Sequence, residues 1–387
     1  MAVHGHTAPG FEELRDVFAS QFGTGENVGA GVSIYLHGRE VAHLWGGTID
    51  EAGTTPWAED TMCVCYSTSK GLTATCLHVL ADRGQVDYEA PVATYWPEFA
   101  QAGKERITIR QLLAHQAGMS RVPPGVSADD YVDWDRVVTP LAAMEPAWEP
   151  GTGAGYHALT FGFLIGEVVR RVSGKSLGTF LRQEICRPLG LENMYIGAPA
   201  SVEPRIAPLY NRFGEEAGTE EQRKAFFAAM PLMAASMQPD GGNLAELLNS
   251  PAGHQAEIPA VSGVMNARDL ARMYGCLANG GEIDGVRLVS PERIGLMSAP
   301  QSFAADKVIV IPVRWSLGYM NGAEGWPQGP RETAFGHPGL GGSTGFADPG
   351  IGMGFGFVCN ALHSGLTGAG RASALADAAR AMVAALG

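Results

Sequence analysis

The sequence predicts an α/β (α+β) protein. An antiparallel sheet flanked by helices is expected from both ends of the chain, with a mainly helical domain inserted between them. Helical and strand-like patterns alternate near the N-terminus and again after about residue 258, whereas the segment between them is mostly helical with long loops. We therefore expect an α/β domain at 1–55 and 256–387, an inserted domain at 56–255, and an active site at their interface.

The N-terminal part is expected to contain one helix and one hairpin. Residues 11–20 carry apolar side chains on one helical face, and strand-like runs follow at 28–36 and 40–45. His37-Gly38-Arg39 between the runs is typical of a tight turn. A helix that leads into an antiparallel pair suits the start of an α+β layer.

The middle of the chain shows three helical patterns. Apolar residues recur at helical spacing after Ser67 until Arg83-Gly84, and a short helix is expected at 107–115. A longer helix is predicted from Leu159 to Val172, and it ends at Ser173-Gly174.

Helix and strand alternate in the C-terminal third. A helix is predicted at 267–278, strands at 308–315, 343–347 and 352–359, and an alanine-rich helix at 370–386.

Composition excludes several classes of protein. Of the 387 residues, 45% are hydrophobic and 17% charged, as in an ordinary globular protein, and the net charge of −13 argues against nucleic-acid or anionic-membrane partners. No run approaches 18 apolar residues and no secretory signal is present, so a cytoplasmic location is expected. Six cysteines and ten histidines are scattered, which predicts free thiols, no metal site and no cofactor. Nothing in the pattern indicates an oligomeric state.

The stretch from Cys65 to Leu72 is the candidate catalytic segment. Ser67 should stand at a helix N-terminus with Lys70 one turn later on the same face. There the N–H of Ser67 can bind an anionic oxygen, and the helix dipole with partial burial should lower the pKa of Lys70. A neutral lysine can take the serine proton. The alternative is a serine that caps the helix, followed by a solvated lysine. A catalytic interpretation of Ser67 and Lys70 therefore requires supporting residues elsewhere in the sequence.

Two glycine-rich stretches offer such partners. In Gly155-Tyr156-His157-Ala158, a tyrosine beside a lysine cation would have a lowered phenol pKa and could act as base or proton relay. In the run 335–345, the N–H of Leu340 could be the second donor to an oxyanion. The alternatives are a core tyrosine and a plain transition from loop to strand.

Together these motifs, in this order, resemble the serine β-lactamase and penicillin-binding-protein superfamily. The resemblance is to its class C side and especially to the bacterial family VIII carboxylesterases, and it extends from about residue 28 to about residue 360. Beyond Ser67, Lys70 and Tyr156, it rests on the stretches 111–119, 150–156, 187–194 and 335–339.

The resemblance implies a β-lactamase/DD-peptidase-like fold and a role for each motif. Ser67 would be acylated, and Lys70 and Tyr156 would share the proton transfers as general base and acid. His337-Pro338-Gly339 falls at the position of the family's Lys-Thr-Gly motif, and Leu340 at the oxyanion amide just after it.

Three departures from the β-lactamase pattern favour an esterase. Ala158 stands where an asparagine would bind the amide side chain of a β-lactam. His337, expected to be mostly neutral, replaces a lysine near the substrate carboxylate, and Pro338 replaces a threonine hydroxyl. These changes remove groups that recognise β-lactams and leave the residues for acyl transfer.

Other candidates fit less well. Ser343 lies in a G-x-S-x-G pattern, but strands surround it, and only Asp348 separates it from His363, so the nucleophile-elbow context is missing. His115 and His157 are expected to be structural. Loops at 120–135, 210–225 and 238–256 are expected to cover the pocket. Four tryptophans could wall it, although each also fits plain packing: Trp134, Trp148, Trp315 and Trp326.

The sequence thus predicts a serine carboxylesterase that hydrolyses small, short-acyl esters through an acyl-enzyme on Ser67. An acyltransferase using the same site, a weak β-lactamase or peptidase, and a non-catalytic binding protein are the alternatives. The expected partner is a small-molecule ester.

Overall fold

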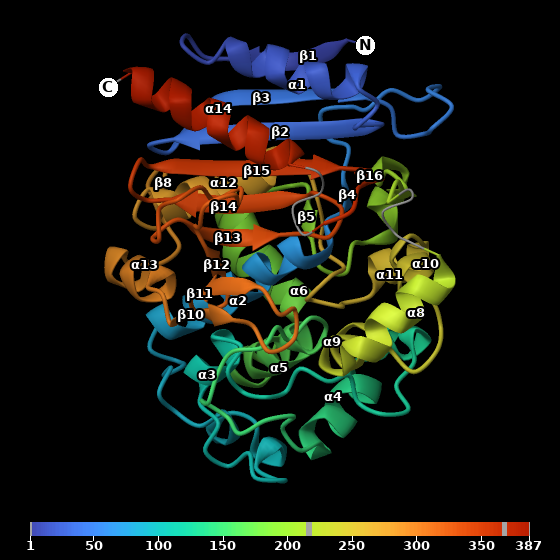
Figure 1. Cartoon of the computed structure of the whole chain (residues 1–387). Helices are drawn as coiled ribbons and strands as arrows, with labels where there is room; N and C mark the ends of the chain where they lie inside the picture. The colour runs from blue at the N-terminus through green and yellow to red at the C-terminus, as the bar shows by residue number, and fades with distance from the viewer. Residues whose placement is uncertain (1, 214–218, 366–369, 387) are drawn as a thin grey trace.

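A computed structural model describes residues 2–213, 219–365 and 370–386. Its main feature is a nine-stranded sheet in the order β1-β3-β2-β15-β14-β13-β12-β11-β10, in which all neighbouring strands are antiparallel. Figure 1 shows β1 at one edge of this sheet and β10 at the other. The strands are β1 Val3–Thr7, β2 Gly29–Leu36, β3 Arg39–Gly47, β10 Ser302–Ala305, β11 Pro312–Trp315, β12 Met320–Asn321, β13 Phe335–Pro338, β14 Thr344–Asp348 and β15 Met353–Cys359.

Helices cover both faces of the sheet. On one face, α1 (Glu13–Gly23) and α14 (Arg371–Leu386) bury a cluster that includes Phe18, Phe355 and Leu375 (Figure 1). On the other face, α12 (Ala267–Ala278) packs against β2, β14 and β15 and joins the larger core. Both chain ends therefore contribute to one layered unit, because each apolar sheet face needs a cover.

The segment between β3 and α12 is mainly helical, apart from short strands. The helices are α2 Ser69–Asp82, α3 Ile109–Leu113, α4 Trp134–Ala143, α5 Thr160–Ser173, α6 Leu177–Phe180, α7 Arg187–Leu189, α8 Glu220–Ala229, α9 Pro231–Met237, α10 Leu244–Leu248 and α11 Pro251–Gln255. Strands β4 (Cys63–Val64), β7 (Val264–Met265) and β5 (Met194–Tyr195) form a small separate sheet. The remaining strands are the pairs β6 (Tyr210–Asn211) with β16 (Ala361–Leu362) and β8 (Glu282–Ile283) with β9 (Val286–Arg287), and helix α13 spans Pro291–Ser298.

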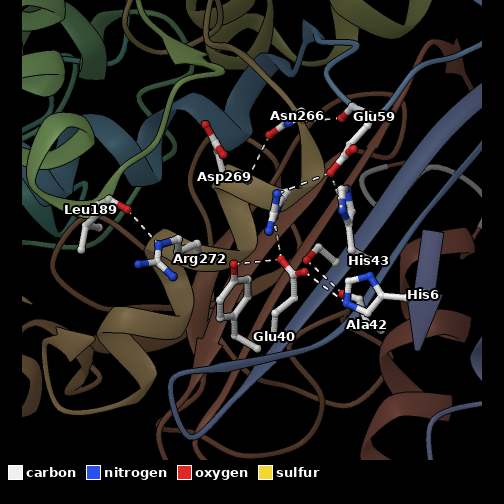
Figure 2. Close-up of polar contacts among 12 residues, drawn as sticks. His6, Glu40, Ala42, His43, Glu59, Leu189, Asn266, Asp269 and Arg272 are labelled. Carbon is white, nitrogen blue, oxygen red and sulfur yellow. Dashed lines mark hydrogen bonds and ion pairs between the residues drawn. The ribbon is translucent and has the colours of Figure 1, made fainter. Parts of the chain in front are cut away.

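Polar contacts join β3 to α12 near one edge of the sheet (Figure 2). The carboxylate of Glu40 on β3 accepts hydrogen bonds from Tyr35 at 2.9 Å and from Arg268 at 2.8 Å. At the start of α12, the side chain of Asn266 caps the helix by accepting from the N–H of Asp269 at 2.9 Å (Figure 2). Burial raises the pKa of Asp269 to about 6.

Most predicted elements are present. The hairpin, α2, α5 and α12 lie where periodicity placed them, and Gly174 ends α5 with a φ of 70°. The predicted fold class is confirmed, whereas the division into 1–55 with 256–387 and 56–255 stays a prediction.

Three local predictions were wrong or incomplete. Of the strand predicted at 308–315, only Pro312–Trp315 is β-structure, because residues 306–311 fold into a turn around Asp306. The predicted loops also contain helices: 120–135 holds a 3-10 helix at Ala128–Val132 and the start of α4, 210–225 holds the start of α8, and 238–256 holds α10 and α11. Strand β1 was not predicted, since it pairs only with β3 at the sheet edge.

Within the described residues, no helix combines the length and apolarity needed to cross a membrane. All six cysteines are free, as predicted, and all six are buried.

Candidate active site

Ser67 lies in a strained turn immediately before α2. It is the second residue of a 3-10 turn, Tyr66–Thr68, that runs directly into the helix. Tyr66 has a φ of 43°, a left-handed conformation that non-glycine residues rarely adopt. Such strain persists only where the surroundings hold it, and it is typical of functional sites. The turn leaves the N–H of Ser67 without an intrahelical acceptor.

Lys70 projects from the first turn of α2 toward Ser67. Its Nζ lies 3.0 Å from Ser67 Oγ and donates a hydrogen bond to the carbonyl of Ala260 at 3.1 Å. The side chain is completely buried, and no carboxylate is paired with it among the described residues. Burial lowers the pKa of Lys70 well below its ordinary value, which confirms the predicted direction. Its lone pair is therefore available to accept the serine proton.

Tyr156 completes the contacts of the Ser67 hydroxyl. Its OH donates to Ser67 Oγ at 2.7 Å, and Lys70 Nζ lies over its ring, 4.8 Å from the centroid. Burial raises the pKa of Tyr156, although its hydrogen bond with Ser67 opposes this. The predicted lowering of the phenol pKa was therefore wrong. A buried lysine that prefers its neutral form supplies no cation to stabilise a phenolate.

Strand β13 and the turn after it pack against the Tyr66–Thr68 turn that carries Ser67. A Cβ on Gly339 would lie 2.2 Å from the carbonyl oxygen of Cys65 and 2.4 Å from Ser343 Oγ, so only glycine permits this approach. Leu340 follows, and its N–H donates to no backbone or side-chain acceptor within the described residues. The residue is 43% exposed.

His337 is buried and neutral. Burial, together with repulsion from Lys70 when that lysine is charged, lowers the pKa of His337 to about 3, so the histidine is neutral, as was expected. Its Nδ1 donates to the carbonyl of Pro338 at 2.7 Å, and its ring stacks on that of Tyr156 at 5.9 Å. It therefore offers no cation to a substrate carboxylate.

A small apolar pocket of about 160 Å³ opens beside Ser67. Apart from Ser67, Tyr156 and His337, its lining is apolar or aromatic: Tyr66, Ala158, Leu159, Met237, Leu244, Val261, Met320, Pro338 and Leu340. Lining residues come from the Ser67 turn, the Tyr156 segment, the α9–α10 region, the segment before β7, and strands β12 and β13 with the turn after β13. Such a site suits an uncharged ligand with a small polar centre.

A larger groove of about 490 Å³ continues from this pocket. Tyr66, Leu244 and Leu340 line both spaces. Leu209, Phe213 and Leu362 add apolar surface to the groove, and the carboxamides of Asn211 and Asn249 near them bond to backbone groups of Phe213 and Leu209.

The pocket-covering loops were predicted only in part. Leu244 from 238–256 lines the pocket, and Asn211 and Phe213 from 210–225 line the groove, although 214–218 falls outside the described residues. No described residue of 120–135 lines either space. Met237 and Met320 were missed, because an isolated methionine carries no signal that separates a pocket wall from core.

The alternative nucleophile is held in a structural role. Ser343 Oγ donates to the carbonyl of Cys65 at 2.8 Å, while His363 Nε2 bonds to the carbonyl of Glu26 and Asp348 pairs with Arg331. These three residues therefore form no catalytic triad. His115 and His157 are both buried, and each binds a backbone N–H, as structural histidines do.

The four tryptophans are packing residues rather than pocket walls. None lines the pocket among the described residues. Trp315 stacks on Tyr156, Trp148 and Trp326 pack against the same cluster, and Trp134 contacts Phe163.

A serine hydroxyl in contact with a buried lysine and a tyrosine is the arrangement that acyl transfer to a serine nucleophile needs. Comparison with known proteins agrees with this chemistry. Residues 14–380 match the family model described as Beta-lactamase, and the chain belongs to this family.

Its relatives include esterases. Over 348 residues, the chain is 39% identical to Esterase/beta-lactamase LipL of Mycobacterium tuberculosis, which covers 88% of this chain and 78% of that protein. A crystal structure of a family VIII carboxylesterase is 40% identical, with a TM-score of 0.90 and coverage of 99% of this chain and 100% of that chain. EstA from Arthrobacter nitroguajacolicus Rue61a is 31% identical, with a TM-score of 0.86 and coverage of 99% of both chains. The predicted resemblance is confirmed.

Proposed function

We propose that the protein is a serine carboxylesterase that hydrolyses small carboxylic esters through an acyl-enzyme on Ser67. The esterases among its relatives support this activity. The observation that carries the assignment of residues is the pair of contacts at Ser67 Oγ, from Lys70 at 3.0 Å and from Tyr156 at 2.7 Å. One partner is suited to accept a proton, and the other to donate one.

Acylation begins with attack of Ser67 Oγ on the ester carbonyl carbon. The hydroxyl proton moves to neutral Lys70, the new C–O bond forms, and the carbonyl π electrons move to oxygen. The N–H groups of Ser67 and Leu340 would bind this oxyanion, each contributing on the order of 3 kcal/mol to the transition state.

Collapse of the tetrahedral intermediate breaks the bond to the alcohol oxygen. That oxygen leaves as an alkoxide unless it is protonated, and Tyr156 is the protonated group in place to supply the proton. The Lys70 ammonium then returns a proton to the phenolate, so both groups regain their resting states. In deacylation, water takes the place of the alcohol and the same transfers run in reverse order.

The pocket favours neutral esters over β-lactams. Ala158 cannot hydrogen-bond to an amide through its side chain, and His337 stays uncharged at neutral pH. The 160 Å³ space beside Ser67 accommodates a short acyl group or a small alcohol.

The acyl group of the ester substrate should extend into the groove. Because Tyr156 must protonate the alcohol oxygen, the alcohol has to lie on the Tyr156 side of Ser67. The acyl group then extends in the other direction, past Leu340 and Leu244, where the groove begins. Short acyl groups fit the pocket alone, and longer chains would continue into the groove.

The test is hydrolysis of p-nitrophenyl acetate, butyrate and octanoate, and of nitrocefin, by wild type, Ser67→Ala and Ser343→Ala. We expect ester turnover that Ser67→Ala abolishes and Ser343→Ala largely retains, with slow cleavage of nitrocefin. Retained turnover in Ser67→Ala would refute the nucleophile, and fast nitrocefin cleavage would refute the preference for esters. Ester products formed when alcohols are added would reveal an acyltransferase.

A further inference from the structure

The position of Tyr156 depends on contacts with other segments of the chain. Residues 153–157 belong to no helix or strand, so no regular hydrogen-bond ladder holds the tyrosine. A general acid must be placed within a fraction of an ångström to act. The neighbours that bind this segment therefore determine where the phenol lies.

One buried carboxylate binds the segment directly. Asp306, in the turn between β10 and β11, is 2% exposed, and its Oδ1 accepts from the backbone N–H of Tyr156 at 3.0 Å. The same oxygen accepts from the N–H groups of Val308 and Ile309, at 2.8 and 3.0 Å. Asp306 thus joins the Tyr156 segment to its own turn.

The second oxygen of this carboxylate orients the ring on which Tyr156 lies. Asp306 Oδ2 accepts from the indole N–H of Trp315 on β11 at 3.0 Å. The ring of Trp315 stacks on that of Tyr156, with centroids 5.7 Å apart and planes inclined by 18°. One side chain therefore holds both the backbone of Tyr156 and the aromatic surface beside its phenol.

The turn that carries Asp306 is itself strained. Val310 has a φ of 59°, which is costly for a β-branched residue, and its N–H donates to the backbone carbonyl of Asp306 at 3.0 Å. The side chain of Asp306 adds the two bonds to Val308 and Ile309 that close this turn. Strain of this kind persists only in a rigid surrounding.

The charge of Asp306 is not neutralised by a cation. Its four side-chain partners are all N–H donors, which suits a carboxylate because a carboxylate can only accept. No ion pair among the described residues includes it. Glu167 makes a useful contrast: it also accepts from an indole, that of Trp134 at 2.8 Å, but it is paired with Arg170 and Arg171. Of these two carboxylates, Asp306 is the one that lies near the phenol without a cationic partner, and its charge adds to burial in raising the pKa of Tyr156.

We propose that Asp306 is a positioning residue for catalysis, which fixes Tyr156 through its backbone N–H and through Trp315 so that the phenol lies where it can protonate the leaving alcohol. This inference rests on the proposed function, in which Tyr156 acts as the general acid.

The test uses one acyl group with two leaving groups. Ethyl butyrate needs a proton at its departing oxygen, whereas p-nitrophenyl butyrate does not, so the ratio of their kcat/KM values reports on the acid. We expect Asp306→Asn to lower kcat/KM for ethyl butyrate by at least about tenfold, through misplacement of the phenol, and that for p-nitrophenyl butyrate by less. The basic limb of the ethyl butyrate pH profile should move to lower pH, because loss of a negative charge eases ionisation of the phenol.

The matched control is Glu167→Gln, which changes a buried carboxylate bound to an indole away from the pocket. It should leave both the ratio and the pH profile as in wild type, whatever it does to the Tm. The inference is overturned if Asp306→Asn shows the wild-type ratio and profile.

If Asp306→Asn does not fold, Trp315→Phe carries the test. It keeps the carboxylate and a ring but removes the N–H that holds the ring, so the ratio should change in the same direction, and an unchanged ratio would refute the inference. A wild-type protein without activity on p-nitrophenyl butyrate would refute the proposed function instead.

Discussion

Replacement of Tyr156 by phenylalanine tests the division of roles at the site. The change removes one hydroxyl, which donates to Ser67 Oγ at 2.7 Å, and leaves the ring stacked on Trp315 and His337. The fold therefore loses about one buried hydrogen bond, worth roughly 1 kcal/mol, and we expect the protein to stay folded.

The effect on the reaction should be larger and selective. Proton transfer by a positioned side chain contributes about 10²–10⁴-fold, which corresponds to roughly 3–5 kcal/mol of transition-state free energy. Because burial keeps Tyr156 protonated, this contribution belongs to departure of the alcohol and not to activation of Ser67. An alkoxide needs that proton, but p-nitrophenolate is stable as an anion near neutral pH.

The assay compares kcat/KM of wild type and Tyr156→Phe for ethyl butyrate, followed by proton release in a pH-stat, and for p-nitrophenyl butyrate, followed by absorbance. In a ping-pong reaction kcat/KM reports on acylation alone, so the shared deacylation step does not hide the effect. We expect a loss on the order of 10²–10⁴-fold for the ethyl ester and a much smaller loss for the activated ester. Equal losses for both would assign Tyr156 to attack by Ser67, and no loss would remove it from the reaction.

Three further predictions follow from particular contacts. Gly339→Ala should reduce ester kcat/KM by about 100-fold, because a Cβ 2.2 Å from the Cys65 carbonyl must push β13 away from the Ser67 turn; full activity in this variant would contradict the close approach. The pKa of Asp269 is raised from 3.8 to about 6, so the folded state favours the protonated carboxyl. The stability that this preference contributes is fully present below pH 3.8 and is lost as the pH rises through 6. Asp269→Asn should therefore raise the free energy of unfolding by up to about 3 kcal/mol at pH 8, and urea titrations should show this gain shrink as the pH falls below 6. Leu244→Trp narrows the passage from pocket to groove and should lower the octanoate-to-acetate ratio of kcat/KM by about tenfold, since each buried methylene contributes roughly 0.8 kcal/mol. Leu247→Trp is the control, because it changes a half-buried leucine of α10 that lines neither the pocket nor the groove. An unchanged ratio in Leu244→Trp would refute the proposal that the acyl chain extends into the groove.

Local spacing was enough to predict the parts of the site that lie on one element. Ser67 and Lys70 are three residues apart across the start of α2, so their contact follows from helix geometry. The end of α5 was predictable for the same reason, because Gly174 acts within one turn of the helix.

Protonation states were predictable only where burial and charge agree. Burial lowers the pKa of Lys70 in the direction that was predicted, and it keeps His337 in the neutral form that was expected from the residue type. For Tyr156 the two effects compete, and a sequence does not show that Lys70 is too deeply buried to act as a cation. The sequence therefore predicted a lowered pKa for the phenol, whereas burial raises it.

The sequence alone determined the family, the nucleophile candidate and its lysine, because short motifs and helical spacing are local properties of the chain. Only the tertiary structure decided how Tyr156 is held in place and that its phenol stays protonated. Asp306, which binds its backbone N–H, lies 150 residues away in the sequence, and no sequence pattern marks that pairing. The tertiary structure also decided that the pocket around Ser67 opens into a groove between Leu244 and Leu340. Cavities and the pKa values of buried groups arise from side chains of distant segments that meet only when the chain is folded.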